Sequence, residues 1–112
     1  MDSFRESLDI AGGFVSGTLT TLKNAPDVFG CKASWASTGN CEITLDRPIP
    51  LGRARVWASP LVANPLTLHN CERIDDSHWI IQWWTLGVAA GPALTETPTK
   101  FDFCFGVSVI PE

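Results

Sequence analysis

The sequence predicts an all-β protein, an antiparallel β-sandwich or jelly roll of about seven or eight strands. Apolar residues recur at every second position over several segments, which is the pattern of strands that bury one face. Clusters of Gly, Pro, Asn and Asp separate these segments, as turns do. A length of 112 residues and a hydrophobic content of 45% fit one domain with one core.

The first residues follow a different pattern. Ser3 and Glu6 have the S-x-x-E spacing of a capping box, in which two side chains satisfy backbone donors at the start of a helix. Phe4 and Leu8 would then share one face of a short helix, and the pair Gly12-Gly13 would end it. Because a helix of two turns is not stable alone in water, its apolar side must dock on the domain or on another protein.

The chain is therefore expected to consist of a short helical or extended arm over residues 1–12 and a β-sandwich over residues 13–112. Within the arm, Phe4, Leu8 and Ile10 are the apolar residues expected to bind a partner.

The strands of the sandwich can be placed by their alternation. In segment 41–46, Ile43 and Leu45 point one way while Glu42 and Thr44 point the other. Proline-rich and Asp-rich stretches break the pattern, and the Gly-, Pro- and Thr-containing segment 87–100 is expected to be a long surface loop. The expected strands are 14–23, 28–36, 41–46, 53–59, 66–74, 78–85 and 101–109.

Two of these strands are expected to hold the core. Segment 78–85 is apolar on both faces, which favours a central strand that is covered on both sides. Segment 101–109 places five bulky residues on one face, and such a strand would anchor a sandwich. These residues are Phe101, Phe103, Phe105, Val107 and Val109.

Charge and hydropathy exclude two classes of partner. The net charge of −4 and a pI near 5.0 argue against nucleic-acid binding, which needs a basic surface. The one basic cluster, Arg47, Arg53 and Arg55, is small and lies near acidic residues. No apolar run is long enough to span a membrane, and the N-terminus lacks the pattern of a signal peptide. We therefore expect no membrane partner and a chain that stays in the cytosol where it is made.

The expected cytosolic compartment decides how the four cysteines are interpreted, namely Cys31, Cys41, Cys71 and Cys104. Cytosolic thiols stay reduced, and no pair has the CxxC spacing of a zinc site. Free and mostly buried thiols are the favoured interpretation, with disulfides and a metal site as the open alternatives.

No motif points to catalysis or to a cofactor. His69 and Cys71 share one face of an extended strand and could form a dyad, but no glycine-rich elbow accompanies them. Asp75 and Asp76 are adjacent in a turn, whereas glycosidases need two carboxylates facing each other across a cleft. Phosphate-loop, dinucleotide-binding and HExxH motifs are also missing. We expect neither an enzyme nor a metal or cofactor site.

Five tryptophans and no tyrosine in 112 residues is an unusual composition. Trp side chains fill cores, anchor interfaces and stack on sugars. Trp57 lies on one strand with Arg53 and Arg55, and it is expected either at an interface or in the core. Trp84 is similar. If both tryptophans lie outside the core, their strands present a strip suited to packing on another subunit.

The order of motifs resembles the small C1q/TNF-like jelly-roll domains of phage virion proteins. The resemblance rests on three segments between residues 14 and 110: Gly39 to Leu45, Ala54 to Pro60, and Phe101 to Phe105. It implies a homotrimer. A chain with only a short arm is then expected to be a capsid decoration or cement protein, which bridges capsomers and has the major capsid protein as its partner.

This hypothesis places the chain in the virion, after synthesis in the host cytoplasm. The alternative is a receptor- or carbohydrate-binding fibre-tip module that uses the loops near residues 60–65 and 87–100. A small enzyme using His69 and Cys71, and a cellular interaction domain, are the remaining hypotheses.

Overall fold

The computed structural model describes residues 8–49, 53–61, 67–88 and 94–109, and in these residues the chain forms nine strands and no helix. The strands are β1 Leu8–Val15, β2 Val28–Phe29, β3 Cys31–Ser37, β4 Asn40–Leu45, β5 Ala54–Pro60, β6 Thr67–Arg73, β7 His78–Val88, β8 Leu94–Pro98 and β9 Phe103–Val109. The predicted all-β class is confirmed.

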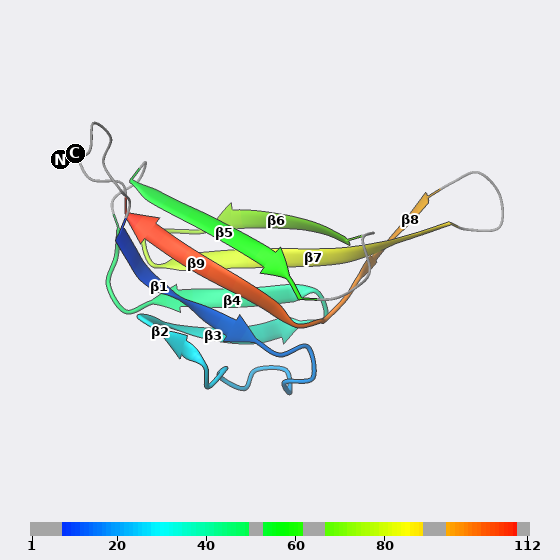
Figure 1. Cartoon of the computed structure of the whole chain (residues 1–112), viewed down its shortest axis with the longest axis horizontal. Helices are drawn as coiled ribbons and strands as arrows, with labels where there is room; N and C mark the ends of the chain where they lie inside the picture. Colours follow the sequence, from blue (N-terminus) through cyan, green and yellow to red (C-terminus); the bar gives the residue numbers. More distant parts are fainter. Residues whose placement is uncertain (1–7, 50–52, 62–66, 89–93, 110–112) are drawn as a thin grey trace.

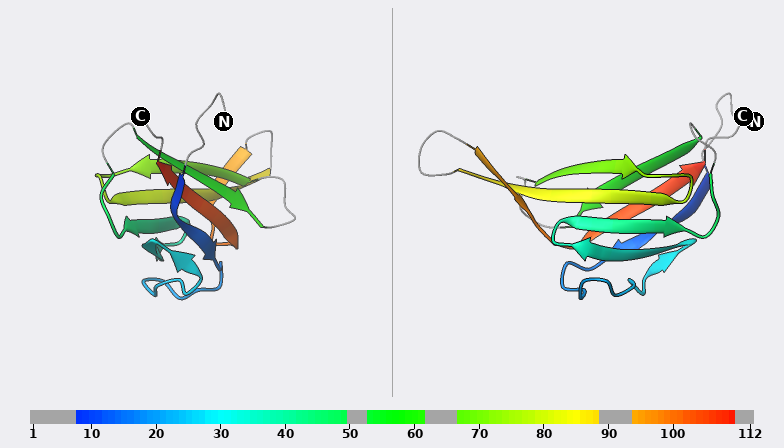
Figure 2. Two further views of the ribbon diagram at one scale, coloured as in Figure 1. Left: turned by 60° about the vertical axis from the view of Figure 1, so that its left-hand side comes forward. Right: turned by 180° about the vertical axis from the view of Figure 1, so that it is seen from behind.

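Two antiparallel sheets face each other as a sandwich (Figure 1). Sheet A has the order β2-β1-β9-β5, and sheet B has the order β3-β4-β7-β6, with β8 paired to β7. The chain passes from one sheet to the other between β2 and β3, β4 and β5, β5 and β6, and β8 and β9. The side and rear views show the two layers that result (Figure 2).

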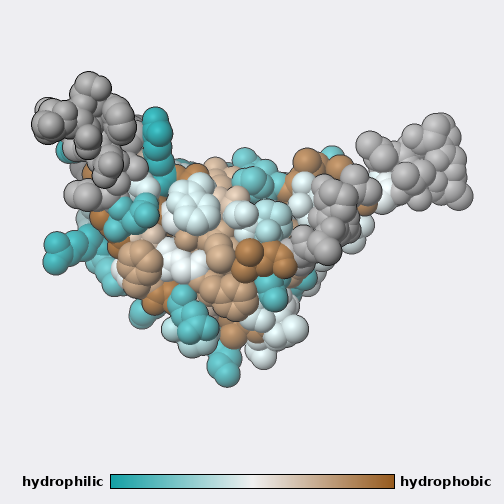
Figure 3. Space-filling view, in the orientation of Figure 1, coloured by the Kyte–Doolittle hydropathy of each residue, from teal (hydrophilic) through white to brown (hydrophobic). Residues whose placement is uncertain are grey.

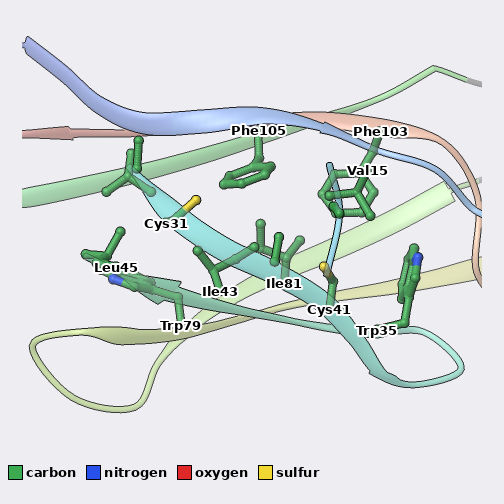
Figure 4. Close-up of a cluster of buried hydrophobic side chains, with 14 of the residues drawn as sticks. Val15, Cys31, Trp35, Cys41, Ile43, Leu45, Trp79, Ile81, Phe103 and Phe105 are labelled. Carbon is green, nitrogen blue, oxygen red and sulfur yellow. The ribbon is translucent and has the colours of Figure 1, made fainter. Parts of the chain in front are cut away.

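The core lies between β9 of sheet A and the central strands of sheet B. Phe103 and Phe105 project from β9 toward Ile43 and Ile81 (Figure 4), and all four are buried. Trp35 closes one end, with its ring edge-on to Phe103 at 5.6 Å between centroids. Burial of each such side chain contributes roughly 1.5–3 kcal/mol, so this layer is the main source of stability. The core predicted for segment 101–109 is confirmed.

The expected helix is not found where the structure can be described. Leu8–Val15 is strand β1, which pairs with β9 along its length. Gly12 and Gly13 lie inside this strand, with φ values of 153° and 141°. A Cβ atom at Gly13 would lie 2.8 Å from the Cα of Val28, so the glycine admits the backbone of β2. The pair therefore permits close strand packing, and it ends no helix.

The domain division changes accordingly. Residues 8–12 of the predicted arm belong to the sandwich, and residues 1–7 lie outside the described residues. The predicted strand 14–23 is also wrong beyond Val15, because residues 16–27 form turns at the edge of the sandwich. The predicted strand 28–36 is split at Gly30, whose φ of 70° bends the chain between β2 and β3.

The segment predicted as a long loop contains strand β8. It pairs with the far end of β7, from Trp84 opposite Pro98 to Val88 opposite Leu94. The two strands form a ribbon that extends beyond the sandwich (Figures 1 and 2). Threonine side chains help to hold it, since Thr95 Oγ1 donates a hydrogen bond to the Gly87 carbonyl at 3.1 Å.

Strand β7 is central, as predicted, between β4 and β6. Its inward residues Trp79, Ile81 and Trp83 are buried. Its outward residues, which include Gln82 and Trp84, are only half-buried, so the predicted cover on both faces is wrong for the outer side.

Candidate functional site: the outer face of sheet A

Trp57 is a large exposed side chain on the outer surface of sheet A, where it belongs to the edge strand β5. It lies in the middle of β5, in register with Gly106 of β9. A Cβ atom at Gly106 would lie 2.5 Å from Trp57 Cε2 and 2.8 Å from Cζ2, so the indole fills the space that any other side chain would take. One side of the ring therefore rests on the β9 backbone, while the residue stays 47% exposed.

The same cross-strand row continues over all four strands of the sheet. Gly106 pairs with Gly12 of β1, and Gly12 pairs with Phe29 of β2. Phe29 is 55% exposed, whereas both glycines are buried. The row thus presents an aromatic side chain at each edge strand and only backbone between them. We call the outer surface of sheet A, centred on this row, the aromatic face.

Polar groups flank the row on one side. Arg55 pairs with Ser108, and Ser108 pairs with Asp9, so the neighbouring row carries one basic and one acidic side chain. Ser108 Oγ donates a hydrogen bond to Asp9 Oδ1 at 2.6 Å, while Arg55 and Asp9 are exposed.

The neighbouring row on the other side of the aromatic row is weakly polar. Ser59 pairs with Cys104 and Cys104 pairs with Phe14, and the latter two are half-buried. Figure 3 views the aromatic face directly and shows aromatic rings and apolar or weakly polar side chains over β5, β9 and β1, with hydrophilic side chains around them. This arrangement of an apolar centre and a polar rim is typical of protein interfaces.

The structure separates the partner-binding residues expected from the sequence. Trp57 and Arg55 lie on the aromatic face. Arg53 precedes β5 and lines a groove at one end of the sandwich, together with Ile10. Phe4 lies outside the described residues, as does the side chain of Leu8.

Phe29, Gly12 and Gly106 were not predicted as parts of the site. The alternation of Val28 and Phe29 could have indicated that Phe29 points outward. No signal in the sequence shows that these residues share a row with Trp57, because that depends on the pairing of strands distant in sequence.

A second, smaller apolar patch lies on sheet B. Trp84 is half-buried on the outer side of β7, in register with Leu68 of β6 and Pro98 of β8. Leu68 is 42% exposed. This patch offers a control surface for experiments on the aromatic face.

The cysteines are free thiols in differing surroundings. Cys31 and Cys41 are buried, whereas Cys71 and Cys104 are half-buried. Burial raises the pKa of Cys31 to about 11 and that of Cys41 to about 12, with the neighbouring Cys31 adding to the shift of Cys41. Both thiols therefore stay protonated at neutral pH and are poor nucleophiles.

The suggested dyad of His69 and Cys71 is not supported as a nucleophile. His69 packs against the Trp83 ring at 4.9 Å between centroids. Burial raises the pKa of Cys71, whereas reactive cysteines need a lowered one.

Asp75 and Asp76 stabilise the turn between β6 and β7. Asp75 Oδ1 accepts hydrogen bonds from the backbone N–H groups of Ser77 at 2.8 Å and His78 at 2.9 Å, and the first of these is the main reason that the pKa of Asp75 is lowered. Asp76 accepts a hydrogen bond from Arg73 Nη2 at 2.6 Å. Both carboxylates are thus engaged in local structure.

The described residues contain no group of three or more His, Cys, Asp or Glu side chains that could hold a metal ion. The same part of the chain has no helix long and apolar enough to cross a membrane. No protein-family model matches the sequence, and comparisons with curated proteins and with solved structures likewise gave no match. Fold and surface together define a β-sandwich protein whose most distinctive feature is an aromatic sheet face.

Proposed function

We propose that this chain is a non-enzymatic structural protein of a virus particle, a capsid decoration protein that assembles as a homotrimer and bridges neighbouring capsomers of a major capsid protein. The row of Trp57, Gly106, Gly12 and Phe29 carries the proposal. In this account the aromatic face joins subunits, and the protein is made in the host cytoplasm before it joins the virion.

The energetics of the row support its use as an interface. Trp57 and Phe29 each keep about half of their surface in water. Covering such a side chain on association contributes roughly 1.5–3 kcal/mol, and Trp is enriched among the residues that dominate interface energies.

The rigidity of the row adds to this argument. The Trp57 ring is already held against the Gly106 backbone, so little side-chain entropy remains to be lost when a partner covers it. The exposed charges of Arg55 and Asp9 lie at its margin, where they can set the orientation of a partner without being desolvated at the centre.

The proposed number of three subunits comes from the family resemblance. A closed ring of subunits is consistent with a single aromatic face on each subunit. Subunits in a ring contact each other through two different surfaces, so one aromatic face can pack on a neighbour without being self-complementary. In a closed ring, a neighbouring subunit also covers every aromatic face.

Light scattering tests the assembly step. The wild type should have the mass of a trimer, and Trp57→Ser should lower the mass to that of a monomer, because it removes a large exposed aromatic contact of the aromatic face. Leu68→Ser, on the exposed side of sheet B, is the matched control and should keep the trimer. A monomeric wild type, or a Trp57→Ser variant that remains trimeric, would contradict the proposal.

Cosedimentation with capsid shells tests the partner. A truncation of the predicted arm has to stop before Leu8, because Leu8 already pairs with Val109 in sheet A. A chain that lacks residues 2–7 should remain a trimer and lose binding to shells. Undiminished binding would exclude the arm as the capsid contact.

A carbohydrate- or receptor-binding module is the second candidate, and the exposed side of the Trp57 indole favours it. An aromatic ring fixed flat on a surface can stack on a sugar. A glycan array separates the candidates, since a decoration protein should show no selective binding, whereas selective binding abolished by Trp57→Ser would favour the module.

A further inference from the structure

Strand β5 is an edge strand of sheet A, and its outer edge pairs with no strand of the described residues. It lies beside β6, the edge strand of sheet B, on one side of the sandwich (Figures 1 and 2). On the opposite side, the loop before β2 covers the edge of β3. The N–H of Leu22 donates a hydrogen bond to the Trp35 carbonyl at 2.8 Å. The N–H of Ala25 donates in the same way to the Ala33 carbonyl at 2.7 Å.

The backbone groups on the outer edge of β5 can be identified from its pairing with β9. The N–H of Leu61, directly after β5, donates a hydrogen bond to the Asp102 carbonyl at 2.9 Å and continues the register between the two strands. Successive residues of a strand turn their N–H and C=O groups to opposite edges. The odd-numbered residues of β5 therefore bond to β9, and the even-numbered residues point outward. The outward N–H groups are those of Ala54, Val56 and Ala58.

Pro60 agrees with this assignment. It is the next even-numbered residue of β5, and proline is accepted in an edge strand where the missing N–H would face away from the neighbouring strand. No backbone group of the described loops bonds to the outward groups of Ala54, Val56 or Ala58. Such an edge is a template for pairing with another chain.

The side chains at the outward-pointing positions face the core side of the sheet. Ala54, Val56 and Ala58 pack against the core and are half-buried. An additional strand beside β5 would extend the sheet and cover them. Because two of these three residues are alanines, the space beside them favours bulky apolar side chains at alternate positions of the added strand.

The charge of Arg55 sets the preference on the outer face of the sheet. This side chain is exposed and makes no ion pair with another described residue. Opposite charges on neighbouring strands stabilise a sheet. The added strand is therefore expected to place a carboxylate beside Arg55.

A second copy of β5 fits this edge less well. In an antiparallel pair centred on Val56, Ala54 would lie opposite Ala58 of the other copy, so that small side chains would meet small ones on the core side. Strand β5 also contains no acidic residue that could face Arg55.

We propose that the outer edge of β5 accepts an extended segment of another protein as an additional antiparallel strand. Its bulky apolar residues would cover Ala54, Val56 and Ala58, and a carboxylate would lie beside Arg55. In this mode of recognition the backbone hydrogen bonds supply affinity and alternate side chains supply specificity. The inference concerns the edge of sheet A and not the aromatic face, so it does not depend on the proposed function.

Amide hydrogen exchange of the full-length protein, measured by NMR, tests the proposal with a synthetic peptide of alternating Ile and Glu as the probe. N-methylation of its Glu amides leaves one edge of the peptide able to pair, the edge that carries the Ile amides. Saturating peptide should slow exchange at Ala54, Val56 and Ala58 by about tenfold. The amides of Arg55 and Trp57 already bond to β9 and are the internal reference. The same peptide N-methylated at its Ile amides should have no effect.

Variants of β5 provide the second arm of the test. Val56→Pro removes the middle outward N–H, keeps an apolar side chain of similar size and leaves the bonds to β9 in place, so it should abolish the protection of Ala54 and Ala58. Val56→Ala removes more of the side chain but keeps the N–H, and it should retain the protection. Arg55→Glu should weaken binding of the Ile-Glu peptide by about threefold and favour the matching Ile-Lys peptide.

Unchanged exchange at the outward amides of β5 in the presence of the peptide would overturn the proposal. Protection along β6 instead of β5 would also overturn it, because the peptide would then occupy the other edge. Protection that appears without peptide and rises with protein concentration would show that a second copy takes the edge, again against the proposal. Peptide-dependent protection that is confined to the outward amides of β5 and lost in Val56→Pro supports it.

Discussion

The Trp57 indole rests directly on the backbone of Gly106, the residue in register with it on the neighbouring strand. Each residue thereby fixes the other. The ring lies on the backbone of the glycine, and it occupies the space where any larger residue at position 106 would place its Cβ atom. The form of the aromatic face follows from this pair.

Replacing Gly106 by alanine should therefore displace the Trp57 ring. The added methyl group would overlap the indole, and overpacking of this kind destabilises proteins by about 1–3 kcal/mol. Urea denaturation of Gly106→Ala against the wild type measures the change in the free energy of unfolding.

The control is the same substitution in a Trp57→Ala background. If the clash with the indole is the cause, Gly106→Ala should then be nearly neutral, and the double-mutant cycle should give a coupling close to the full effect. An equal destabilisation in both backgrounds would mean that the ring is not responsible.

Two buried tryptophans should respond differently to substitution by phenylalanine. Trp35 Nε1 donates a hydrogen bond to the Ser16 carbonyl at 2.9 Å, whereas Trp83 Nε1 is buried and has no partner among the described residues. Trp35→Phe removes one of two hydrogen bonds to the Ser16 carbonyl, which also accepts from the Leu19 N–H at 3.2 Å, whereas Trp83→Phe removes a buried donor that makes no hydrogen bond.

Because both substitutions remove the same volume, Trp35→Phe should be more destabilising than Trp83→Phe, by about 1–2 kcal/mol. Thermal and urea unfolding of the two variants side by side check the order. The reverse order would contradict the hydrogen-bond assignment.

Because the buried thiols have raised pKa values, we expect the protein to lose stability in alkali. Burial raises the pKa of Cys41 from an ordinary value of 9.0 to about 12. Above pH 9 the unfolded chain loses this proton while the folded chain keeps it, so the free energy of unfolding falls as the pH rises toward 12. For a single thiol the slope is at most roughly 1.4 kcal/mol per pH unit. Cys31, whose pKa is raised to about 11, contributes with the same sign.

Urea denaturation between pH 8 and pH 11 tests this dependence. Cys41→Ala should lower stability at pH 8 but flatten the slope above pH 9, because the ionising group is gone. An unchanged slope in the variant would assign the alkaline loss to other groups.

Local patterns were sufficient to predict much of this fold. The alternation in segments 41–46, 53–59 and 101–109 placed β4, β5 and β9 to within a few residues, because one-sided burial imposes a period of two. The Gly12-Gly13 pair led to a wrong prediction, because it is required by close backbone contacts from β9 at Gly12 and from residues 27 and 28 at Gly13, which local sequence does not reveal.

Strand β8 was missed for a related reason. The side chains at positions 95–98 are all exposed, so they show no alternation in burial, and the strand pairs with the far end of β7. Of the candidate site, Trp57 and Arg55 were predictable from their place on one strand. Phe29 and Gly106 were not, because pairing register decides which residues share a row.

The proposal that the aromatic face joins subunits can be tested at Cys104. This thiol lies on that face, one row from Trp57, in register with Ser59 and Phe14. Cys104 is only half-buried in the single subunit, whereas Cys31 and Cys41 are buried, so we expect a maleimide to reach Cys104 before these two thiols.

The most direct test is therefore the rate of Cys104 alkylation, followed by peptide mapping, in the wild type and in Trp57→Ser at matched concentration. Cys104 should be protected in the assembled wild type and should react rapidly in the variant and in highly diluted wild type. Equal, rapid labelling of Cys104 in an assembled wild type would show that subunits associate through another surface and would contradict the claim.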